Sequence, residues 1–412
     1  MRVLFTTSEW PTHFFPMVPL GWALQSAGHE VRVACAPSLV PVVRRSGLVP
    51  VPLLGGPDPA FKTRLARYWE FAARQRPVEP GELLHPVTAA PMDRLEDFDF
   101  AAYRAVHRDA NLRTMRDSCD RIAEFARDWR PGLVVTEPQN VEGVLAGRLL
   151  DVPVVCQLFG LVGTDETEPG LDIVLEDHSD SFARYGLPPM GAGLIDAVLD
   201  PCPPSAAPRT LRPALPVRYV PYNGPGDAPP WAGARPDGGR PRVLIAWGTS
   251  VSGIYGSRAF LVPDLLRALA GADTEVVITA ADADRTGLAA GRPGVRVLDR
   301  WCPLKLLLPT CDAVVHYGSG GTGMTAMAAG VPQLALPFSA EQRMNSARLT
   351  AAGAGFRLDG FDADPAAVAD RVARLLVEPA HRERARALRE EALARPAPAD
   401  LVPRLLDLAA AR

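Results

Sequence analysis

The sequence lacks long hydrophobic runs and any strong net charge. No apolar stretch within its 412 residues reaches the roughly 18 residues needed to span a bilayer. The start, a charged Arg2 within a short predicted strand, is unlike a signal peptide. A formal net charge of −3 gives no basic surface for nucleic acid or an anionic membrane. We therefore expect a soluble protein that binds neither nucleic acid nor a membrane.

Closely spaced cysteine pairs are also missing. The six cysteines, at positions 35, 119, 156, 202, 302 and 311, are scattered and contain no Cys-x-x-Cys pair. This pattern is typical of free thiols in a reducing compartment, not of a disulfide framework or a zinc site. We expect a cytoplasmic protein.

The most informative stretch of the sequence lies between residues 301 and 342. A predicted strand at 313–315 leads into His316-Tyr317-Gly318-Ser319-Gly320-Gly321-Thr322, and a predicted helix follows at 323–329. A glycine-rich turn of this kind exposes main-chain N–H groups that, together with the helix dipole, can hold a phosphate. Glycine is required because a side chain would block the phosphate. Alone the turn is a weak signal, since such turns also occur without a ligand.

Neighbouring segments strengthen this interpretation. Trp301-Cys302-Pro303 precedes the strand, and the Trp301 ring could stack on a nucleobase. Glu341-Gln342 lies just past the next predicted strand, at 333–336, where a carboxylate and an amide could hold sugar hydroxyls. Farther upstream, Gly248-Thr249-Ser250 follows a predicted strand at 242–246. Its hydroxyls could reach a diphosphate or could simply cap the next helix.

The first part of the chain predicts a parallel sheet. Strands at 2–6, 31–35 and 48–53 alternate with helices at 15–27 and 37–46, which is the βαβαβ pattern of a doubly wound sheet. His13 follows the first strand, and Glu137 ends a predicted strand at 133–137, at the strand ends where such sheets bind ligands. By position alone, His13 could merely satisfy a turn, and Glu137 could be a surface residue at a helix start.

In their order, the motifs between residues 301 and 342 resemble the donor-binding segment of GT-B glycosyltransferases that use nucleotide sugars. The resemblance is closest to the actinomycete enzymes that put deoxysugars on polyketide antibiotics. Those usually read W-x-P, H-H-G-G-x-G-T, A-G-[VI]-P-Q and D-Q, whereas this sequence reads W-C-P, H-Y-G-S-G-G-T, A-G-V-P-Q and E-Q. The resemblance implies an α/β fold with two Rossmann-like, doubly wound domains facing across a cleft.

The same resemblance implies an enzyme and assigns roles to its residues. It implies an inverting transfer of a deoxysugar from a thymidine diphosphate (TDP) sugar to an aromatic or other polyketide-type aglycone. His13 would be the base that activates the acceptor, and Glu137 would orient it and stabilise the imidazolium. Glu9 is a weaker rival for that second role. Binding of the nucleotide sugar is implied for Thr249, Ser250, Trp301, Cys302, Pro303, His316, Tyr317, Gly318, Ser319, Gly320, Gly321, Thr322, Glu341 and Gln342.

No cofactor is expected beyond the TDP-sugar, which is a co-substrate. Backbone donors and a helix terminus can stabilise a leaving diphosphate in place of a metal, so we predict a metal-independent reaction. A homodimer and a cytochrome-like activator protein are left open as partners.

Three positions depart from the family pattern. Tyr317 replaces the histidine that normally touches phosphate and offers one neutral hydroxyl, and His316 could then be only structural. Thr325 stands where plant relatives carry a glutamate for the ribose 2′-hydroxyl, which is consistent with a TDP donor. Glu341 replaces the usual aspartate, and its longer arm could suit a deoxy or amino sugar.

We expect an acceptor-binding domain at 1–221, a linker rich in Gly and Pro at 222–240, and a donor-binding domain at 241–395. A helix at 396–412 could pack back on the first domain. Residues 56–110, irregular and rich in Pro, Arg and aromatics, are either an acceptor loop or a mobile insertion. Two functions other than glycosyl transfer stay open. One is a GT-B-like sugar epimerase, which the aromatic insertion argues against. The other is an inactive helper protein, which the tyrosine at position 317 allows.

Overall fold

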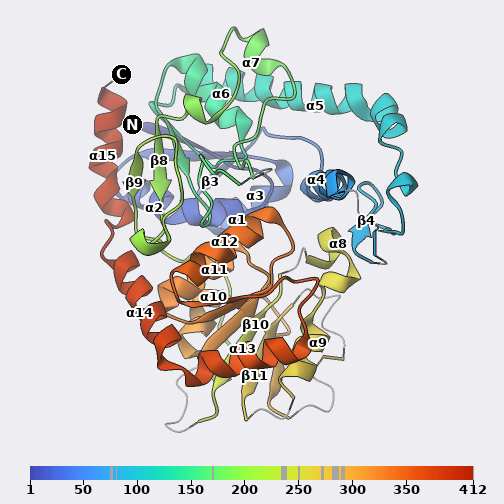
Figure 1. The fold of residues 1–412 in the computed structure, drawn as a ribbon. Coiled ribbons are helices and arrows are strands. Elements are labelled where there is room, and N and C mark those ends of the chain that lie inside the picture. Colours follow the sequence, from blue (N-terminus) through green and yellow to red (C-terminus); the bar gives the residue numbers. More distant parts are fainter. Residues whose placement is uncertain are drawn as a thin grey trace. The chain divides into compact units, whose positions relative to one another are not determined.

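The chain forms two compact units, each with its own sheet (Figure 1). The computed structural model describes residues 1–74, 78–79, 81–168, 171–232, 239–248, 251–270, 273–280, 287–288 and 293–411. Unit 1 combines Met1–Pro57, Ala101–Pro225 and Glu391–Arg412, and unit 2 combines Asp58–Phe100 and Gly226–Glu390. Among the described residues, no helix is long and apolar enough to cross a membrane.

Unit 1 is built on a parallel sheet of seven strands in the order β3-β2-β1-β6-β7-β8-β9. The strands are β1 Arg2–Thr6, β2 Glu30–Cys35, β3 Val49–Pro52, β6 Leu133–Thr136, β7 Val154–Gln157, β8 Ala197–Asp200 and β9 Ala214–Pro216. Every residue of a central strand such as β6 is buried, as expected for a parallel sheet that is covered on both faces. The strand order reverses between β1 and β6, and ligands of doubly wound sheets bind at the carboxyl ends of such strands.

Helices cover this sheet and complete its core. They are α1 Pro11–Phe14, α2 Val18–Ser26, α3 Val40–Arg45, α5 Phe100–Trp129, α6 Val141–Leu150, α7 Ser181–Arg184 and α15 Pro398–Ala410. The last helix belongs to unit 1, since Leu401 and Leu405 share a core cluster with Leu24 of α2. Just before α15, the buried Arg395 donates to the carboxylate and carbonyl oxygens of Asp200, at 3.2 and 3.1 Å.

Unit 2 contains a second parallel sheet, with the order β12-β11-β10-β13-β14-β15. Its strands are β10 Arg242–Ala246, β11 Glu275–Thr279, β12 Val295–Val297, β13 Ala313–His316, β14 Gln333–Ala335 and β15 Gly355–Arg357. Its helices are α4 Pro59–Arg74, α8 Val251–Tyr255, α9 Val262–Ala268, α10 Leu304–Leu307, α11 Gly320–Ala329, α12 Ala340–Ala351, α13 Pro365–Val377 and α14 Pro379–Leu393, the last of which ends in unit 1. Here the order reverses between β10 and β13, the strands that lead into the predicted phosphate-binding residues.

The irregular character expected for residues 56–110 is wrong. This segment holds α4, the short antiparallel pair β4 Leu83–Leu84 and β5 Pro91–Met92, and the first turns of α5. The buried face of α4 carries Phe61, Arg64, Arg67 and Phe71, so two of its inward positions are arginines and the apolar periodicity is interrupted. Asp58–Phe100 of this segment packs within unit 2, whereas the sequence predicted the whole segment in the first domain.

Candidate active site

The predicted base lies next to a carboxylate at the switch point of unit 1. His13 lies in α1, just past β1, and Glu137 directly follows β6. The Nδ1 atom of His13 is 3.5 Å from Oε2 of Glu137 and 3.0 Å from Oγ of Ser8. Glu9, the rival carboxylate, instead accepts a hydrogen bond from Ser38 at 3.1 Å. The structure thus brings His13 and Glu137 together and adds Ser8 between the two strand ends.

Glu137 is fully buried and held as a charged acceptor. Its two oxygens accept main-chain N–H bonds from Ser8 and Gln139, each at 2.9 Å. Burial alone would raise its pKa, but the hydrogen bond and charge of His13, with the two N–H groups, hold the pKa of Glu137 below its usual value. A carboxylate at this position can stabilise an imidazolium.

The orientation of the His13 ring is fixed by packing. The ring stacks on Phe159, with 3.8 Å between centroids and 4° between planes, and the residue is 9% exposed. Because Nδ1 faces Ser8 and Glu137, Nε2 is the nitrogen that can meet a substrate. Phe159 and Ser8 are not among the site residues that the sequence predicted. Ser8 carried a weak signal as a hydroxyl residue just after the first strand, but Phe159 carried none.

The glycine-rich turn in unit 2 joins β13 to α11. Gly318 has φ = 83°. A Cβ there would also lie 2.9 Å from Oγ of Ser346 and 3.0 Å from the carbonyl oxygen of Gln342, so the turn requires glycine. Ser319 is the N-cap of α11. A Cβ on Gly321 would meet nothing within 4 Å, so the first turn of α11 has open space beside its main chain. An anion can approach such a helix start closely.

His316 supports this turn from behind. Its Nδ1 accepts from the N–H of Gly318 at 3.1 Å, and its Nε2 is 3.0 Å from Oε1 of Gln333. Gln333 in turn donates to the carbonyl oxygen of Gly323 in α11, at 3.1 Å. Burial lowers the pKa of His316 to about 4. Both ring nitrogens are therefore used inside the protein, and the imidazole holds the turn rather than reaching a ligand.

Tyr317 lies at the edge of the same turn. Its ring meets that of Trp247 edge-on, at 6.1 Å, and a Cβ on Gly248 would come within 2.5 Å of its hydroxyl oxygen. Burial raises the pKa of Tyr317, although its hydrogen bond with Ser319 acts in the opposite direction. Its hydroxyl is therefore a neutral group beside the N-cap of α11.

The Glu341-Gln342 pair opens α12. The N-cap of this helix, Ser339, accepts from the N–H of Gln342 at 3.3 Å. Gln342 is buried and hydrogen-bonded at both ends of its amide, whereas Glu341 is partly exposed and accepts from Asn345 at 3.2 Å. Asn345 also donates to the carbonyl oxygen of Gly318, at 3.4 Å, which ties α12 to the phosphate turn.

The remaining predicted donor-binding residues differ in exposure. Trp301 is 53% exposed, which suits a ring that stacks on a base. Cys302 is buried in a core cluster with Leu244 and Val314, so its side chain points into the protein and not to a ligand. Pro303 is buried as well, as the N-cap of α10. Thr249 and Ser250 lie outside the described residues.

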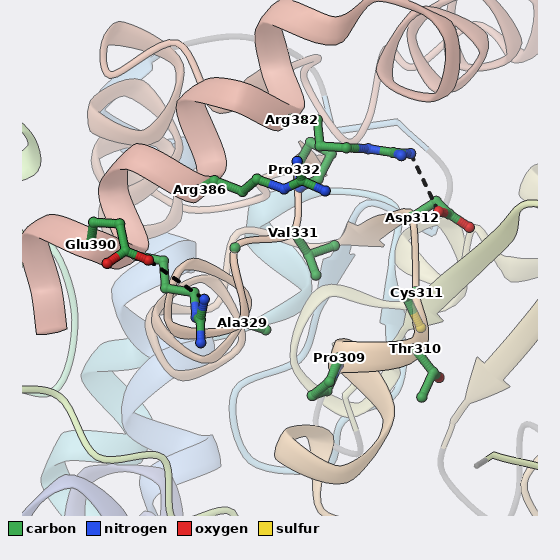
Figure 2. Close-up of a pocket in the computed structure, with 12 residues that line it drawn as sticks. Pro309, Thr310, Cys311, Asp312, Ala329, Val331, Pro332, Arg382, Arg386 and Glu390 are labelled. Atoms are coloured by element: carbon green, nitrogen blue, oxygen red, sulfur yellow. Dashed lines mark hydrogen bonds and ion pairs between the residues drawn. The ribbon is translucent and has the colours of Figure 1, made fainter. Parts of the chain in front are cut away.

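A cavity of about 410 Å³ occurs elsewhere in unit 2 (Figure 2). It lies before β13 and β14, at the amino ends of these strands, and thus at the sheet edge opposite the glycine-rich turn. Figure 2 shows Arg382 pointing to Asp312, at 3.3 Å. Three arginines there surround the C-terminal end of α11, where positive charge stabilises a helix, so the cavity has a structural explanation.

The part of the chain that the structure describes contains no group of three or more His, Cys, Asp or Glu residues suited to a metal ion. The candidate donor site consists of main chain, hydroxyls, the Trp301 ring, the Gln342 amide and the Glu341 carboxylate.

Comparison with known proteins assigns the family. Residues 22–248 match the N-terminal domain, and residues 263–408 the C-terminal domain, of the family described as erythromycin biosynthesis protein CIII-like. The chain belongs to this EryCIII-like family. The relatives named below are glycosyltransferases that use nucleotide sugars, and so is this chain.

Relatives of the EryCIII-like chain span its whole length. It is 34% identical to 10-deoxymethynolide desosaminyltransferase of Streptomyces venezuelae and 35% identical to TDP-daunosamine transferase DnrS of Streptomyces peucetius. Each match covers 100% of this chain and 97% of the relative. The structure of the spinosyn rhamnosyltransferase SpnG with thymidine diphosphate is 31% identical, with a TM-score of 0.72 over 98% of this chain and 100% of that one. The fold is therefore GT-B.

Proposed function

We propose that this protein transfers a deoxysugar from a TDP-sugar to a polyketide-type aglycone, with inversion at the anomeric carbon, in antibiotic biosynthesis. The sugar and aglycone classes are supported by relatives named as desosaminyl and daunosamine transferases, and by a SpnG structure with spinosyn aglycone. The observation that carries the mechanism is the group formed by Ser8, His13 and Glu137 at the switch point of unit 1.

In unit 1, His13 acts as general base. With a proton on Nδ1, which faces Ser8 and Glu137, the Nε2 lone pair removes the proton of the acceptor hydroxyl. The acceptor oxygen forms a bond to the anomeric carbon while the bond from that carbon to the diphosphate oxygen breaks. The buried Glu137 carboxylate stabilises the resulting imidazolium, and stacking on Phe159 holds the ring plane.

In unit 2, the start of α11 receives the leaving diphosphate. The electron pair of the breaking bond goes to the diphosphate. Its added negative charge is stabilised by the N–H groups and the positive dipole end of the helix. The open space beside Gly321 supports this assignment, and the Ser319 and Tyr317 hydroxyls add neutral donors. The exposed Trp301 supplies a surface for stacking of the thymine base.

We propose that no metal takes part. Support comes from the main-chain N–H groups, helix dipole and hydroxyls described above, which can stabilise a leaving diphosphate without one. Asp282 and Asp284, which follow β11 in the sequence, lie outside the described residues. Chelation is therefore the direct test, and transfer should continue unchanged in EDTA. A loss of activity in EDTA that Mg²⁺ or Mn²⁺ restores would contradict this part.

We also propose that the protein is cytoplasmic. The six cysteines, at positions 35, 119, 156, 202, 302 and 311, lie outside any disulfide, and five of them are buried. Such thiols support a reducing, cytoplasmic setting. A homodimer and an activator protein stay open as partners. Light scattering of the purified protein tests the first, and transfer assays with and without an activator test the second.

A transfer assay distinguishes this function from its alternatives. Purified protein is incubated with TDP-daunosamine, TDP-desosamine or TDP-rhamnose, with and without a polyketide aglycone, and the release of TDP and the anomeric configuration of the product are followed. We expect acceptor-dependent release of TDP and inverted product. An epimerase would convert the donor without an acceptor, and an inactive helper would leave the donor intact.

A further inference from the structure

A helix encoded in the first quarter of the chain supports the end of unit 2 that carries Glu341 and Gln342. This helix, α4, packs on α8 and on the segment before α12. Arg64 of α4 donates to the carbonyl oxygen of Gly253 at 3.0 Å, and Glu70 pairs with Arg343 at 3.1 Å. The neighbourhood of the predicted sugar-binding pair is therefore built partly from a distant stretch of sequence.

Hydrogen bonds fix the orientation of the Gln342 amide. The N–H of Phe338 donates to Oε1 at 2.8 Å, so the oxygen must lie on that side. The NH₂ group then faces Tyr255, and Nε2 donates to its hydroxyl oxygen at 2.9 Å. One N–H of the amide is left without a partner among the described residues. Gln342 can thus offer an N–H donor to a ligand.

Tyr255 is itself held in place by its surroundings. It is buried, and its ring stacks on Phe338 at 5.6 Å and 27°. Burial raises the pKa of Tyr255 to about 12, so its hydroxyl is neutral near pH 7 and can accept from Gln342.

Arg67 of α4 contacts both Phe338 and Tyr255. Its guanidinium donates to the carbonyl oxygen of Phe338 at 2.9 Å and lies 5.2 Å from the Tyr255 ring centroid and 4.8 Å from that of Phe361. Its side chain is only 5% exposed. A buried guanidinium that bonds a carbonyl and stacks on two rings restrains the residue whose N–H orients Gln342.

We propose that Tyr255 and Arg67 are positioning residues for donor recognition, which fix Gln342 so that it presents a single N–H to an oxygen of the donor sugar. Glu341, which only accepts hydrogen bonds, would lie beside it. This inference rests on the proposed function and goes beyond it, because it assigns part of the specificity for the donor sugar to residues outside the family's sequence motifs. A sugar with an acceptor oxygen opposite Gln342 should be favoured over one with a methylene there.

Binding of TDP and of a TDP-sugar to Tyr255→Phe tests this, since the change deletes only the hydroxyl. The probes are TDP and whichever of TDP-daunosamine, TDP-desosamine and TDP-rhamnose the wild type binds tightest. We expect the Kd of the TDP-sugar to rise about 3- to 10-fold and that of TDP to stay within twofold. Tyr222→Phe is the matched control, since the Tyr222 hydroxyl is buried with no partner among the described residues.

A double-mutant cycle separates positioning from general loosening of the fold. If Tyr255 acts through Gln342, Tyr255→Phe should have no further effect on the Kd of the TDP-sugar in a Gln342→Ala background. Arg67→Met should likewise raise the Kd of the TDP-sugar relative to the Kd of TDP. Equal weakening of TDP and TDP-sugar, or full additivity with Gln342→Ala, would overturn the inference. A wild type that binds TDP-sugars no tighter than TDP and transfers none would overturn the proposed function as well.

Discussion

The residues around His13 have separable tasks. Glu137 carries charge, Ser8 bonds the ring nitrogen, and Phe159 holds the ring plane. A base arranged in this way needs all three to present Nε2 in one orientation and one tautomer. Substitutions that leave the shape intact can therefore test each task.

Glu137→Gln removes the charge but keeps the shape. We expect kcat to fall on the order of 10²-fold, because the imidazolium loses its partner. The free energy of unfolding should also fall, by about 1–3 kcal/mol, since the new amide N–H group faces a main-chain N–H of Ser8 or Gln139. Steady-state kinetics and urea unfolding measure the two effects. Glu9→Gln is the control, and equal effects there would refute the assignment.

Ser8→Ala removes the hydroxyl that lies 3.0 Å from Nδ1 and leaves the main-chain N–H bond to Glu137 in place. We expect a decrease of about 3- to 10-fold in kcat, the value of one hydrogen bond, with little change in the affinity for TDP. A variant with the wild-type kcat would show that Ser8 has no part in holding the base.

The sequence predicted His13 and Glu137 but not their neighbours. Strand ends can be read from the alternation of apolar strands and helices, so residues just after them can be placed at one edge of a sheet. Ser8 and Phe159 become relevant only through the direction of one ring and the path of a loop after β7, which no spacing in the sequence encodes.

At the scale of elements, two glycine substitutions in the β13–α11 turn should affect different properties, one stability and the other TDP binding. Gly318→Ala forces a side chain into a backbone with φ = 83° and against Ser346, and should destabilise unit 2 by about 1–2 kcal/mol. Gly321→Ala enters open space and should leave stability unchanged, but its methyl group blocks the anion, so the Kd of TDP should rise about tenfold. Thermal unfolding and calorimetric titration check the pair. Unimpaired TDP binding by Gly321→Ala would place the diphosphate elsewhere.

The same turn should weaken in acid. Because His316 has a folded-state pKa of about 4 against an ordinary value of 6.5, the unfolded chain binds its proton first. This contribution to stability is complete above pH 6.5 and is lost as the pH falls towards 4, by on the order of 3 kcal/mol. Urea unfolding of His316→Gln should show a flatter pH dependence than the wild type, whereas His178→Gln, at an exposed position, should match it. Parallel curves for His316→Gln and wild type would contradict this.

The α4 helix shows where periodicity fails as a guide. Its buried positions include Arg64 and Arg67, each paired with carbonyl oxygens of unit 2. An inward-facing arginine looks like a surface residue in the sequence, and only the packed partners show otherwise. The strands of both sheets, by contrast, are short apolar runs, and most were predicted within one or two residues of their observed ends.

For the molecule as a whole, sequence indicated two doubly wound halves, and the structure has two units with reversed strand orders of that kind. The path of the chain was less predictable. Asp58–Phe100 joins unit 2 and Glu391–Arg412 joins unit 1, because packing and buried pairs such as Arg395 with Asp200 depend on long-range contacts. Two such sheets provide two strand-end sites, one with a base and one with an anion-binding helix start.

The measurement that tests the central claim most directly is sugar transfer by His13→Ala, with TDP affinity measured on the same sample and His29→Ala as control. The account predicts a fall in kcat/KM of about 10²- to 10⁴-fold with unchanged affinity for TDP, because the base is lost while the donor site in unit 2 is intact. Transfer at the wild-type rate by His13→Ala would contradict it.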